Sequence, residues 1–352
     1  NNTIVLRRKK MKGLIVTKEH QLRLVDDIPL PVLGEYDALV RNVCCIICNG
    51  TDNEIINGSL AEIRDYPVML GHESAGYVVE CGAKVRNYQK GDLVTRSIVR
   101  KNEKYASGWG AFSEYGVVTD YQAMIADGYQ EASKYTIGLM QRVFPAGITP
   151  LQAAMTITFK EVYSAFCRIG VAKNDILLIV GDGPVGLCMT SIAEMFGVDE
   201  LYMLGENEMT LAMAEKMGAT AVYDHRNPEQ LQALTKRCVR KVNHYIDTVG
   251  LESTTRQGLP FLAPDGMITV YGLRSGKELH LPLSGMRNWG VRFMQFPIHE
   301  KEGAAHNVIC QAVLTGRLQP ERLISHCLPI ADFQEGFALI RNKKAVKVAL
   351  LL

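Results

Sequence analysis

The chain has 352 residues, a mass of 39.0 kDa and a formal net charge of +2. This length favours about two domains, and a composition with 47% hydrophobic and 22% charged residues excludes a disordered or collagen-like chain. Because positive and negative charges nearly balance, no global field attracts nucleic acid or an anionic membrane. The sequence also has no membrane-spanning apolar run. We therefore predict neither a nucleic-acid partner nor a membrane partner.

Nine cysteines are spread over the chain from Cys44 to Cys327, without the regular spacing of a secreted disulfide framework. Their odd number favours a reducing compartment. We therefore predict a cytoplasmic protein in which most thiols are small, buried apolar groups.

Short runs with β-type composition fill the first third of the chain, and turn formers such as Gly91-Asp92 separate them. These runs are Gly13–Val16, Asp37–Val43, Ala75–Glu80, Leu93–Arg96 and Phe112–Thr119. Such a pattern predicts a compact, partly open β-barrel. After it, Thr149-Pro150 predicts the N-cap and first position of a helix.

Strand and helix patterns alternate from this helix to about residue 300. The predicted strands are Ile176–Val180, Leu201–Leu204, Ala219–Tyr223, His244–Asp247 and Met267–Tyr271, and the clearest helices are Pro184–Phe196 and Met209–Met217. Repeated strand–helix units predict a doubly wound parallel sheet of the Rossmann type. The fold class is therefore α/β.

The last part of the chain has two further helices, Val308–Leu314 and Ala331–Ile340, and two strands, Ser325–Pro329 and Val346–Leu351. A nucleotide domain is already complete without them. We therefore expect residues 11–155 to form the catalytic domain, 156–305 the dinucleotide-binding domain, and 306–352 a tail that completes the catalytic domain.

A glycine-rich motif, Gly181-Asp182-Gly183-Pro184-Val185-Gly186, follows the first predicted strand of the sheet and opens a helix. Gly181 is expected to make the tight turn, Gly183 to admit a pyrophosphate, and Gly186 to let helix and strand pack closely. Pro184 and Val185 begin the helix whose terminal amides bind the phosphates. This context predicts an NAD or NADP site.

The second strand of a dinucleotide domain ends where the adenosine ribose is recognised. Here it ends in Gly205-Glu206-Asn207. Glu206 favours NAD, because a carboxylate accepts from ribose hydroxyls and repels a 2′-phosphate. Gly205 argues for NADP, because a missing acid leaves room for that phosphate. Arg226, which follows the third strand, can also approach the adenosine end. The sequence favours NAD and leaves NADP open.

A metal site is indicated by Cys48, which follows a predicted strand, and by His72-Glu73, which begin 24 residues later. A thiolate, an imidazole and a carboxylate are ligands that zinc takes, and a catalytic zinc needs three protein ligands with one open position. The order of these motifs ahead of a dinucleotide domain favours one catalytic zinc.

The sequence has three further motifs beside the metal and glycine motifs: Gly71-His72-Glu73-x-x-Gly76, Gly91-Asp92-Leu93-Val94 and Gly110–Tyr115. Together they resemble the zinc-dependent medium-chain alcohol dehydrogenase family, and most of all its sorbitol, threonine and glucose dehydrogenase branch. The resemblance implies a GroES-like catalytic barrel beside a Rossmann domain, and hydride transfer between an alcohol or sugar substrate and NAD(P). It also implies a homodimer or homotetramer.

The chain departs from this family at two metal positions. Relatives with a structural zinc carry a four-cysteine lobe, whereas Arg96–Gly108 contains no cysteine, so we expect no structural zinc. Relatives also place a glutamate at or near the metal where this chain has Ile157. Two residues remain as replacements: Glu73, or Glu161 one helical turn later, whose side chain leans back toward the vacated position. We favour Cys48, His72 and Glu73.

A third departure is Asn49, an extra residue after the metal cysteine. By resemblance, Thr51 relays the substrate proton to solvent and Asp52 lies near the metal. Polar residues of the loop 97–108, such as Asn102, Tyr105 and Ser107, suit a polyhydroxylated substrate. Two alternatives stay open: a zinc-free reductase of the same superfamily, and a dinucleotide-binding protein without catalysis.

Overall fold

The computed structural model describes residues 9–272, 278–282 and 288–352. It divides the chain into two compact units, one made of Asn1–Lys160 and Ile298–Leu352, the other of Glu161–Pro297. The predicted domain boundaries lie a few residues away from these divisions. The difference arises because one helix runs unbroken through the first boundary, from Pro150 to Ile169, and the helix at the second boundary begins at His299. A helix N-cap in the sequence therefore does not mark the end of a unit.

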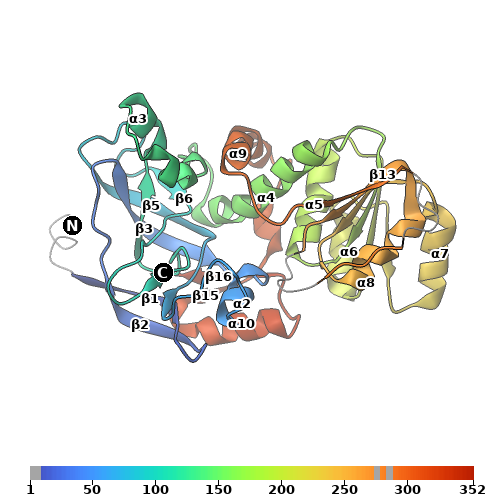
Figure 1. The fold of residues 1–352 in the computed structure, drawn as a ribbon, viewed down its shortest axis with the longest axis horizontal. Helices are drawn as coiled ribbons and strands as arrows, with labels where there is room; N and C mark the ends of the chain where they lie inside the picture. Colours follow the sequence, from blue (N-terminus) through green and yellow to red (C-terminus); the bar gives the residue numbers. More distant parts are fainter. Residues whose placement is uncertain (1–8, 273–277, 283–287) are drawn as a thin grey trace. The chain divides into compact units, whose positions relative to one another are not determined.

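The first unit is built on two β-sheets (Figure 1). Its strands are β1 (Lys10–Val16), β2 (Leu22–Pro29), β3 (Asp37–Ile46), β4 (Val68–Met69), β5 (Ser74–Cys81), β6 (Leu93–Thr95), β7 (Ala106–Ser107), β8 (Tyr115–Thr119), β15 (Ile324–Pro329) and β16 (Lys347–Leu351). One sheet has the order β2-β1-β4-β7, and the other β15-β16-β3-β5-β6, with β8 paired to β3. A bridge between Gly13 and Ser113 joins the sheets around a buried apolar core. The predicted strand-rich barrel is confirmed.

The helices of this unit lie around the two sheets. They are α2 (Thr51–Ile56), α3 (Tyr121–Ala126), the 3₁₀ segment η1 (Ala132–Leu139), α4 (Pro150–Ile169, which continues into the second unit), α9 (His299–Leu314), η3 (Pro320–Leu323), η4 (Ile330–Asp332) and α10 (Phe333–Arg341). Thr149 caps α4 as predicted: its hydroxyl accepts from the Gln152 amide at 3.2 Å, while the Gln152 side chain accepts from the Thr149 amide at 3.0 Å.

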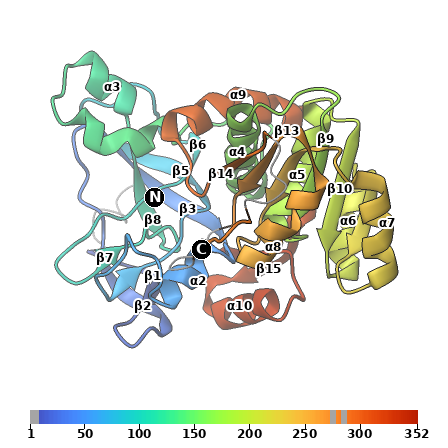
Figure 2. The same cartoon turned by 45° about the vertical axis from the view of Figure 1, so that its right-hand side comes forward.

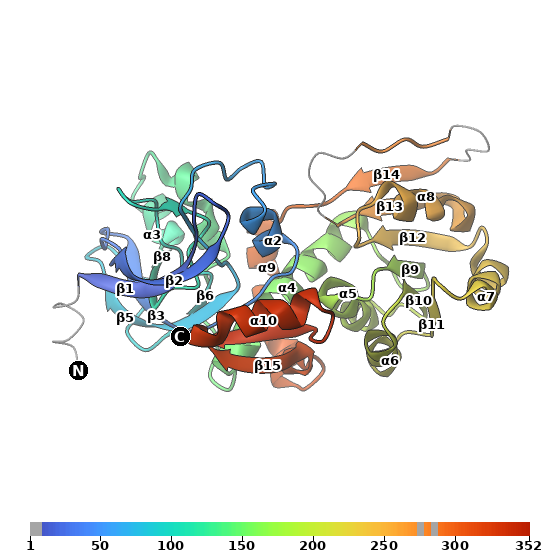
Figure 3. The same cartoon turned by 90° about the horizontal axis from the view of Figure 1, so that it is seen from below.

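The end of the chain returns to the first sheet. β16 pairs antiparallel with β3, with Ala349 opposite Ile46, and β15 pairs parallel with β16. The helix α10 packs on these two strands (Figure 3). The final strand therefore lies directly beside the strand that leads to Cys48.

The second unit is a six-stranded parallel sheet of order β11-β10-β9-β12-β13-β14. Its strands are β9 (Ile176–Val180), β10 (Glu200–Gly205), β11 (Ala221–Asp224), β12 (Val242–Asp247), β13 (Leu262–Val270) and β14 (Gly290–Phe293). Its helices are α5 (Pro184–Met195), α6 (Glu208–Lys216), α7 (Pro228–Cys238), α8 (Glu252–Gln257) and η2 (Leu259–Phe261). The predicted doubly wound parallel sheet is confirmed.

The order in which the chain adds strands to this sheet reverses next to β9. The chain steps outward from β9 to β10 and β11, then crosses back to β12 on the other side. Right-handed crossovers then put α5 and α6 on one face and α7 and α8 on the other. Figure 3 shows α5 and α8 on opposite faces, and α6 and α7 flank the β10 end of the sheet (Figure 2). In doubly wound sheets, ligands bind in the crevice that forms at the carboxyl ends of the strands where the strand order reverses.

No helix in the described ranges is both long and apolar enough to cross a membrane. The prediction that most thiols are buried is confirmed for Cys44, Cys45, Cys188, Cys238 and Cys310. It is wrong for Cys167 and Cys327, which are exposed because they lie on the outward side of α4 and on an alternate residue of the edge strand β15. Burial raises the pKa of Cys44 to about 12, so this thiol near Cys48 stays protonated.

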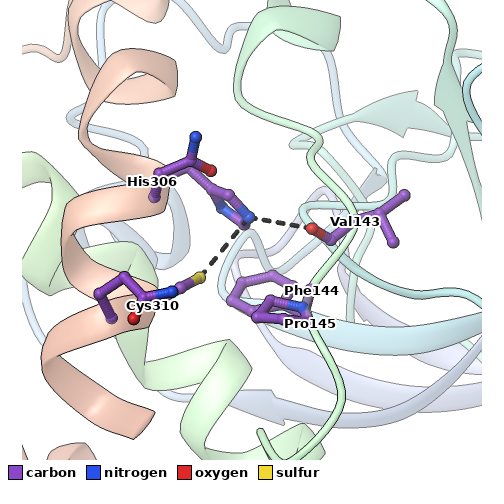
Figure 4. A pocket seen from close by; sticks show the side chains of 7 residues that line it. Val143, Phe144, Pro145, His306 and Cys310 are labelled. Carbon is purple, nitrogen blue, oxygen red and sulfur yellow. Dashed lines mark hydrogen bonds between the residues drawn. The ribbon is translucent and has the colours of Figure 1, made fainter. Parts of the chain in front are cut away.

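A pocket of about 300 Å³ opens in the first unit between α9 and the segment ahead of α4 (Figure 4). It is lined by Val143, Phe144, Pro145, His306, Asn307, Cys310 and Gln311. His306 Nε2 lies 3.0 Å from the Val143 carbonyl and 3.6 Å from Cys310 Sγ. Since a carbonyl only accepts, Nε2 carries the proton. Burial lowers the pKa of His306 to about 3, with the nearby Lys160 charge acting in the same direction.

This neutral histidine makes stability depend on pH. When the chain unfolds, His306 returns to its ordinary pKa of 6.5, so between pH 6.5 and about 3 the unfolded state binds a proton that the folded state does not. The free energy of unfolding should therefore fall with decreasing pH in this window, by up to about 1.4 kcal/mol per unit. We expect His306→Gln, which keeps a donor for the Val143 carbonyl, to lose this contribution. Denaturant titrations from about pH 7.5 to 4.5 should give a wild-type advantage that shrinks on acidification; a constant difference would refute the assignment.

Candidate active site

The metal-ligand candidates meet where β3 ends and β5 begins. Ligand atoms of Cys48, His72 and Glu73 all lie within 4.8 Å of one another. The two strands are antiparallel, with Cys45 opposite Ser74, and the Ile46 amide donates to the Glu73 carbonyl at 2.9 Å. Sheet pairing therefore brings together two motifs that are distant in sequence.

His72 is oriented by a buried acid. Its Nδ1 lies 3.5 Å from Asp52 Oδ1, while its Nε2 lies 3.9 Å from Glu73 Oε1. Asp52 is fully buried, and its other oxygen accepts from the Cys48 amide at 2.9 Å. Burial alone would lower the pKa of His72, but the Asp52 carboxylate and the Cys48 sulfur outweigh it and hold that pKa well above its ordinary value. One buried acid therefore accepts a hydrogen bond from the Cys48 backbone and faces the imidazole with its other oxygen.

Glu73 has a partner that the sequence did not reveal. Lys347, the first residue of β16, places Nζ at 2.9 Å and 2.7 Å from the two carboxylate oxygens. The two side chains are 4% and 3% exposed, so this ion pair is buried. Burial raises the pKa of Glu73, but the Lys347 charge outweighs burial and leaves it below the ordinary value. Glu73 is therefore an ionised carboxylate.

Ile157, at the position where relatives carry a glutamate, cannot bind a metal. Ile157 is fully buried on α4 and has no donor atom. Of the two replacement ligands, Glu73 lies beside Cys48 and His72. Glu161 belongs to the second unit, and its role stays a prediction.

The segment after Cys48 forms a short helix. Thr51 is the first residue of α2 and is half-buried, while Asn49 accepts from the Asn53 side chain through its backbone carbonyl at 2.7 Å. The inserted Asn49 thus makes part of the turn that starts α2. The ring of Trp109 lies 5.3 Å from that of His72 and forms an aromatic wall beside the cluster.

The expectation that the loop 97–108 offers groups to a substrate stays a prediction, and its main candidates have partners within the protein. Asn102 Oδ1 accepts from the Tyr105 amide at 2.9 Å, the Tyr105 hydroxyl donates to Asp27 at 2.5 Å, and Ser107 donates to the Val99 carbonyl at 2.6 Å. These groups hold the loop in shape, since backbone amides and carbonyls outside regular structure need partners too.

The glycine motif has the predicted geometry in the second unit. Gly181 has a φ of +103°, which favours glycine, and a side chain at Gly186 would come within 2.0 Å of the Gly181 carbonyl. Gly183 is exposed, has open space where a side chain would begin, and precedes Pro184 and Val185 at the start of α5. The helix N-terminus is therefore accessible to a phosphate. Thr248, which follows β12 and donates to the Val180 carbonyl at 2.8 Å, closes the other side of the turn and was not predicted.

The residues expected at the adenosine end are mostly engaged with one another. Asn207 caps α6 by accepting from the Met209 amide at 3.0 Å. Arg226 binds both oxygens of Asp224 and the Glu206 carbonyl, and these contacts lower the pKa of Asp224 to about 2. The Glu206 carboxylate lies 3.4 Å from His225. Gly205 ends β10 beneath a side chain from the glycine motif.

Comparison with known proteins gives matches to two family models. The "Alcohol dehydrogenase GroES-like domain" model matches residues 34–127, and the "Zinc-binding dehydrogenase" model matches residues 184–301. Each model therefore falls mainly on one of the two parts of the chain described above.

Curated relatives match the chain over nearly its full length. An alcohol dehydrogenase of Cupriavidus necator is 27% identical, with 97% of this chain and 98% of the relative covered. An L-threonine 3-dehydrogenase of Bacillus velezensis is 24% identical, with coverages of 97% and 99%. Among solved structures, an Escherichia coli alcohol dehydrogenase in complex with NADH superposes with a TM-score of 0.80 at 18% identity, covering 98% of this chain and all 100% of that one. The fold is shared over the whole chain.

Proposed function

The chain belongs to the zinc-type medium-chain alcohol dehydrogenase family and is an NAD(P)-dependent alcohol dehydrogenase, and we propose that it uses one catalytic zinc held by Cys48, His72 and Glu73. The observation that carries the proposal is the meeting of these three side chains in the first unit. We further propose that no structural zinc accompanies it, because Arg96–Gly108 offers no cysteine.

The chemistry of the cluster fits a zinc ion. Thiolate sulfur, imidazole nitrogen and carboxylate oxygen are its usual protein donors, and three ligands leave a position for substrate. Histidine ligands of zinc turn their second nitrogen toward a carboxylate, which fixes the ring. Asp52 stands at that nitrogen of His72, at 3.5 Å, while Nε2 faces Cys48 and Glu73.

When bound, zinc lowers the pKa of an alcohol so that it loses its proton near neutral pH. The residues of this chain then have separate tasks. Asp52 holds His72 and the Cys48 backbone in place. The Trp109 ring shields the cluster on one side, and the half-buried Thr51 hydroxyl passes the substrate proton to solvent. The amides that open α5 hold the cofactor phosphates.

The substrate we propose is a secondary alcohol, polyol or sugar. Curated relatives include an L-threonine 3-dehydrogenase and a sorbitol dehydrogenase, and these names support such a substrate. We also propose that the protein is a homo-oligomer. In the described part of the chain, β14 is one of the two outer strands of its sheet; Phe293 at its end is 58% exposed, and the nearby Phe296 is 50% exposed. A second copy covering this edge would bury both rings.

The test is an activity screen over secondary alcohols, polyols, sugars and hydroxy acids with NAD and NADP, following reduced nicotinamide by absorbance. We expect turnover that a chelator abolishes and added zinc restores. Turnover that survives complete zinc removal would favour a zinc-free reductase. Cofactor binding without turnover on any substrate would favour a non-catalytic dinucleotide-binding protein.

A further inference from the structure

The end of β10 lacks the side chain that usually recognises the adenosine ribose, and the space is filled from another segment. A Cβ added to Gly205 would lie 2.5 Å from both Cβ and Cγ of Asp182 and 2.7 Å from its Oδ2. The Asp182 carboxylate therefore stands where a side chain of residue 205 would begin. Asp182 is the second residue of the glycine motif, so the carboxylate comes from the turn after β9 rather than from the end of β10.

Three hydrogen bonds fix this carboxylate. Its Oδ2 accepts from the Glu206 amide at 3.1 Å, the Asn207 amide at 2.7 Å and the Thr210 hydroxyl at 2.8 Å. Across residues 9–272, 278–282 and 288–352 the structure gives Asp182 no hydrogen bond at Oδ1. One oxygen is thus anchored to the turn after β10, while the other is available to a ligand hydroxyl.

A nearby cation is already paired with an acid. An enzyme that binds NADP places an arginine on the 2′-phosphate. Arg226 follows β11 at this end of the sheet, and its Nη2 lies 2.7 Å from Asp224 Oδ2 while its Nε lies 2.9 Å from Oδ1. These bonds direct the Nε and Nη2 groups of Arg226 to Asp224, so its charge is already paired with an acid. A 2′-phosphate would also approach the Asp182 carboxylate, with like charges in contact.

We propose that Asp182 accepts from the adenosine ribose hydroxyls and makes the protein selective for NAD over NADP. The proposal rests on the proposed function, because it requires that the second unit binds a nicotinamide dinucleotide. It replaces Glu206, whose carboxylate is turned to His225, as the discriminating acid. Asp182 is then a specificity-determining residue supplied by the phosphate-binding loop.

Binding measurements on the whole protein test this without catalysis. Dissociation constants of NADH and NADPH are followed by nicotinamide fluorescence, and those of 5′-AMP and adenosine 2′,5′-bisphosphate by calorimetry. Asp182→Asn keeps the size of the side chain and removes its charge. We expect it to reduce the NADH-over-NADPH preference by about tenfold to a hundredfold, the value of a charge-assisted hydrogen bond. The two adenosine ligands should shift in the same direction.

Two further variants keep the test decisive. Glu206→Gln removes the rival acid and should leave the preference within about twofold of wild type. Asp199→Asn removes an exposed charge at the opposite end of β10 and should change neither affinity. An unchanged preference in Asp182→Asn, or a loss found in Glu206→Gln instead, would overturn the proposal while dinucleotide binding stands. Wild type that binds neither NADH nor NADPH would overturn the proposed function, and this inference with it.

Discussion

Replacing His72 by alanine is expected to lower kcat/KM for the alcohol by about 1,000-fold or more, because a catalytic metal supplies several kcal/mol of transition-state stabilisation. The zinc content of the purified protein should fall with it. Binding of NADH should persist, since the glycine motif and its supporting strands belong to the other unit. Steady-state kinetics, metal analysis and nicotinamide fluorescence on one preparation measure all three.

The matched control is His280→Ala. The His280 side chain is 72% exposed in the second unit, so its loss should leave zinc content and activity unchanged. A His72→Ala protein that keeps its zinc and its turnover would refute the ligand assignment. Loss of NADH binding together with zinc would instead point to general unfolding.

Removing the Lys347 charge is expected to have the largest effect on stability. Lys347→Met keeps an unbranched side chain of similar length but leaves the Glu73 carboxylate buried without its counter-ion. Breaking one half of a buried pair costs about 3–5 kcal/mol. Zinc should compensate in part, because the ion becomes the main positive charge on Glu73. We therefore expect thermal unfolding at a lower temperature without metal, and a larger zinc-induced rise in Tm than in wild type.

Lys84→Met is the matched control for this substitution. Lys84 pairs with Glu35 at 2.9 Å in the same unit, but the two side chains are 46% and 63% exposed. Exposed pairs contribute about 0–1 kcal/mol, so Tm should hardly change. The double substitution Lys347→Met with Glu73→Gln should recover part of the metal-free stability. Equal losses in Lys347→Met and Lys84→Met would contradict the burial argument.

Local sequence patterns were enough to predict five of the six strands of the parallel sheet, because a strand covered on both faces is a nearly continuous apolar run. Ile176–Val180 is such a run, and it is β9 without change of bounds. The outer strand β14, whose last two residues are exposed, was not predicted. The edge strand β2 was not predicted, since Asp26-Asp27 lie within it and all of its residues except Ile28 are half-buried or exposed. An edge strand carries polar residues that resemble a loop in sequence.

The same distinction applies to the site. Cys48, His72 and Glu73 belong to short motifs whose residue types are common zinc ligands, so they were predicted from the sequence. Lys347 was missed because it lies 274 residues from Glu73 and sits in an ordinary strand pattern. Asp182 was noted as a variable position of the glycine motif. Its importance depends on the absence of a side chain at Gly205, and only the pairing of β9 with β10 brings the two together.

The number of zinc ions per chain, measured by elemental mass spectrometry on the purified protein, tests the central claim most directly. One zinc ion in wild type and in Glu161→Ala, with little or none in Glu73→Ala, is the result expected for one catalytic ion on Cys48, His72 and Glu73. Two ions in wild type would reveal a structural zinc. Full zinc in Glu73→Ala together with its loss in Glu161→Ala would contradict the proposed ligand set.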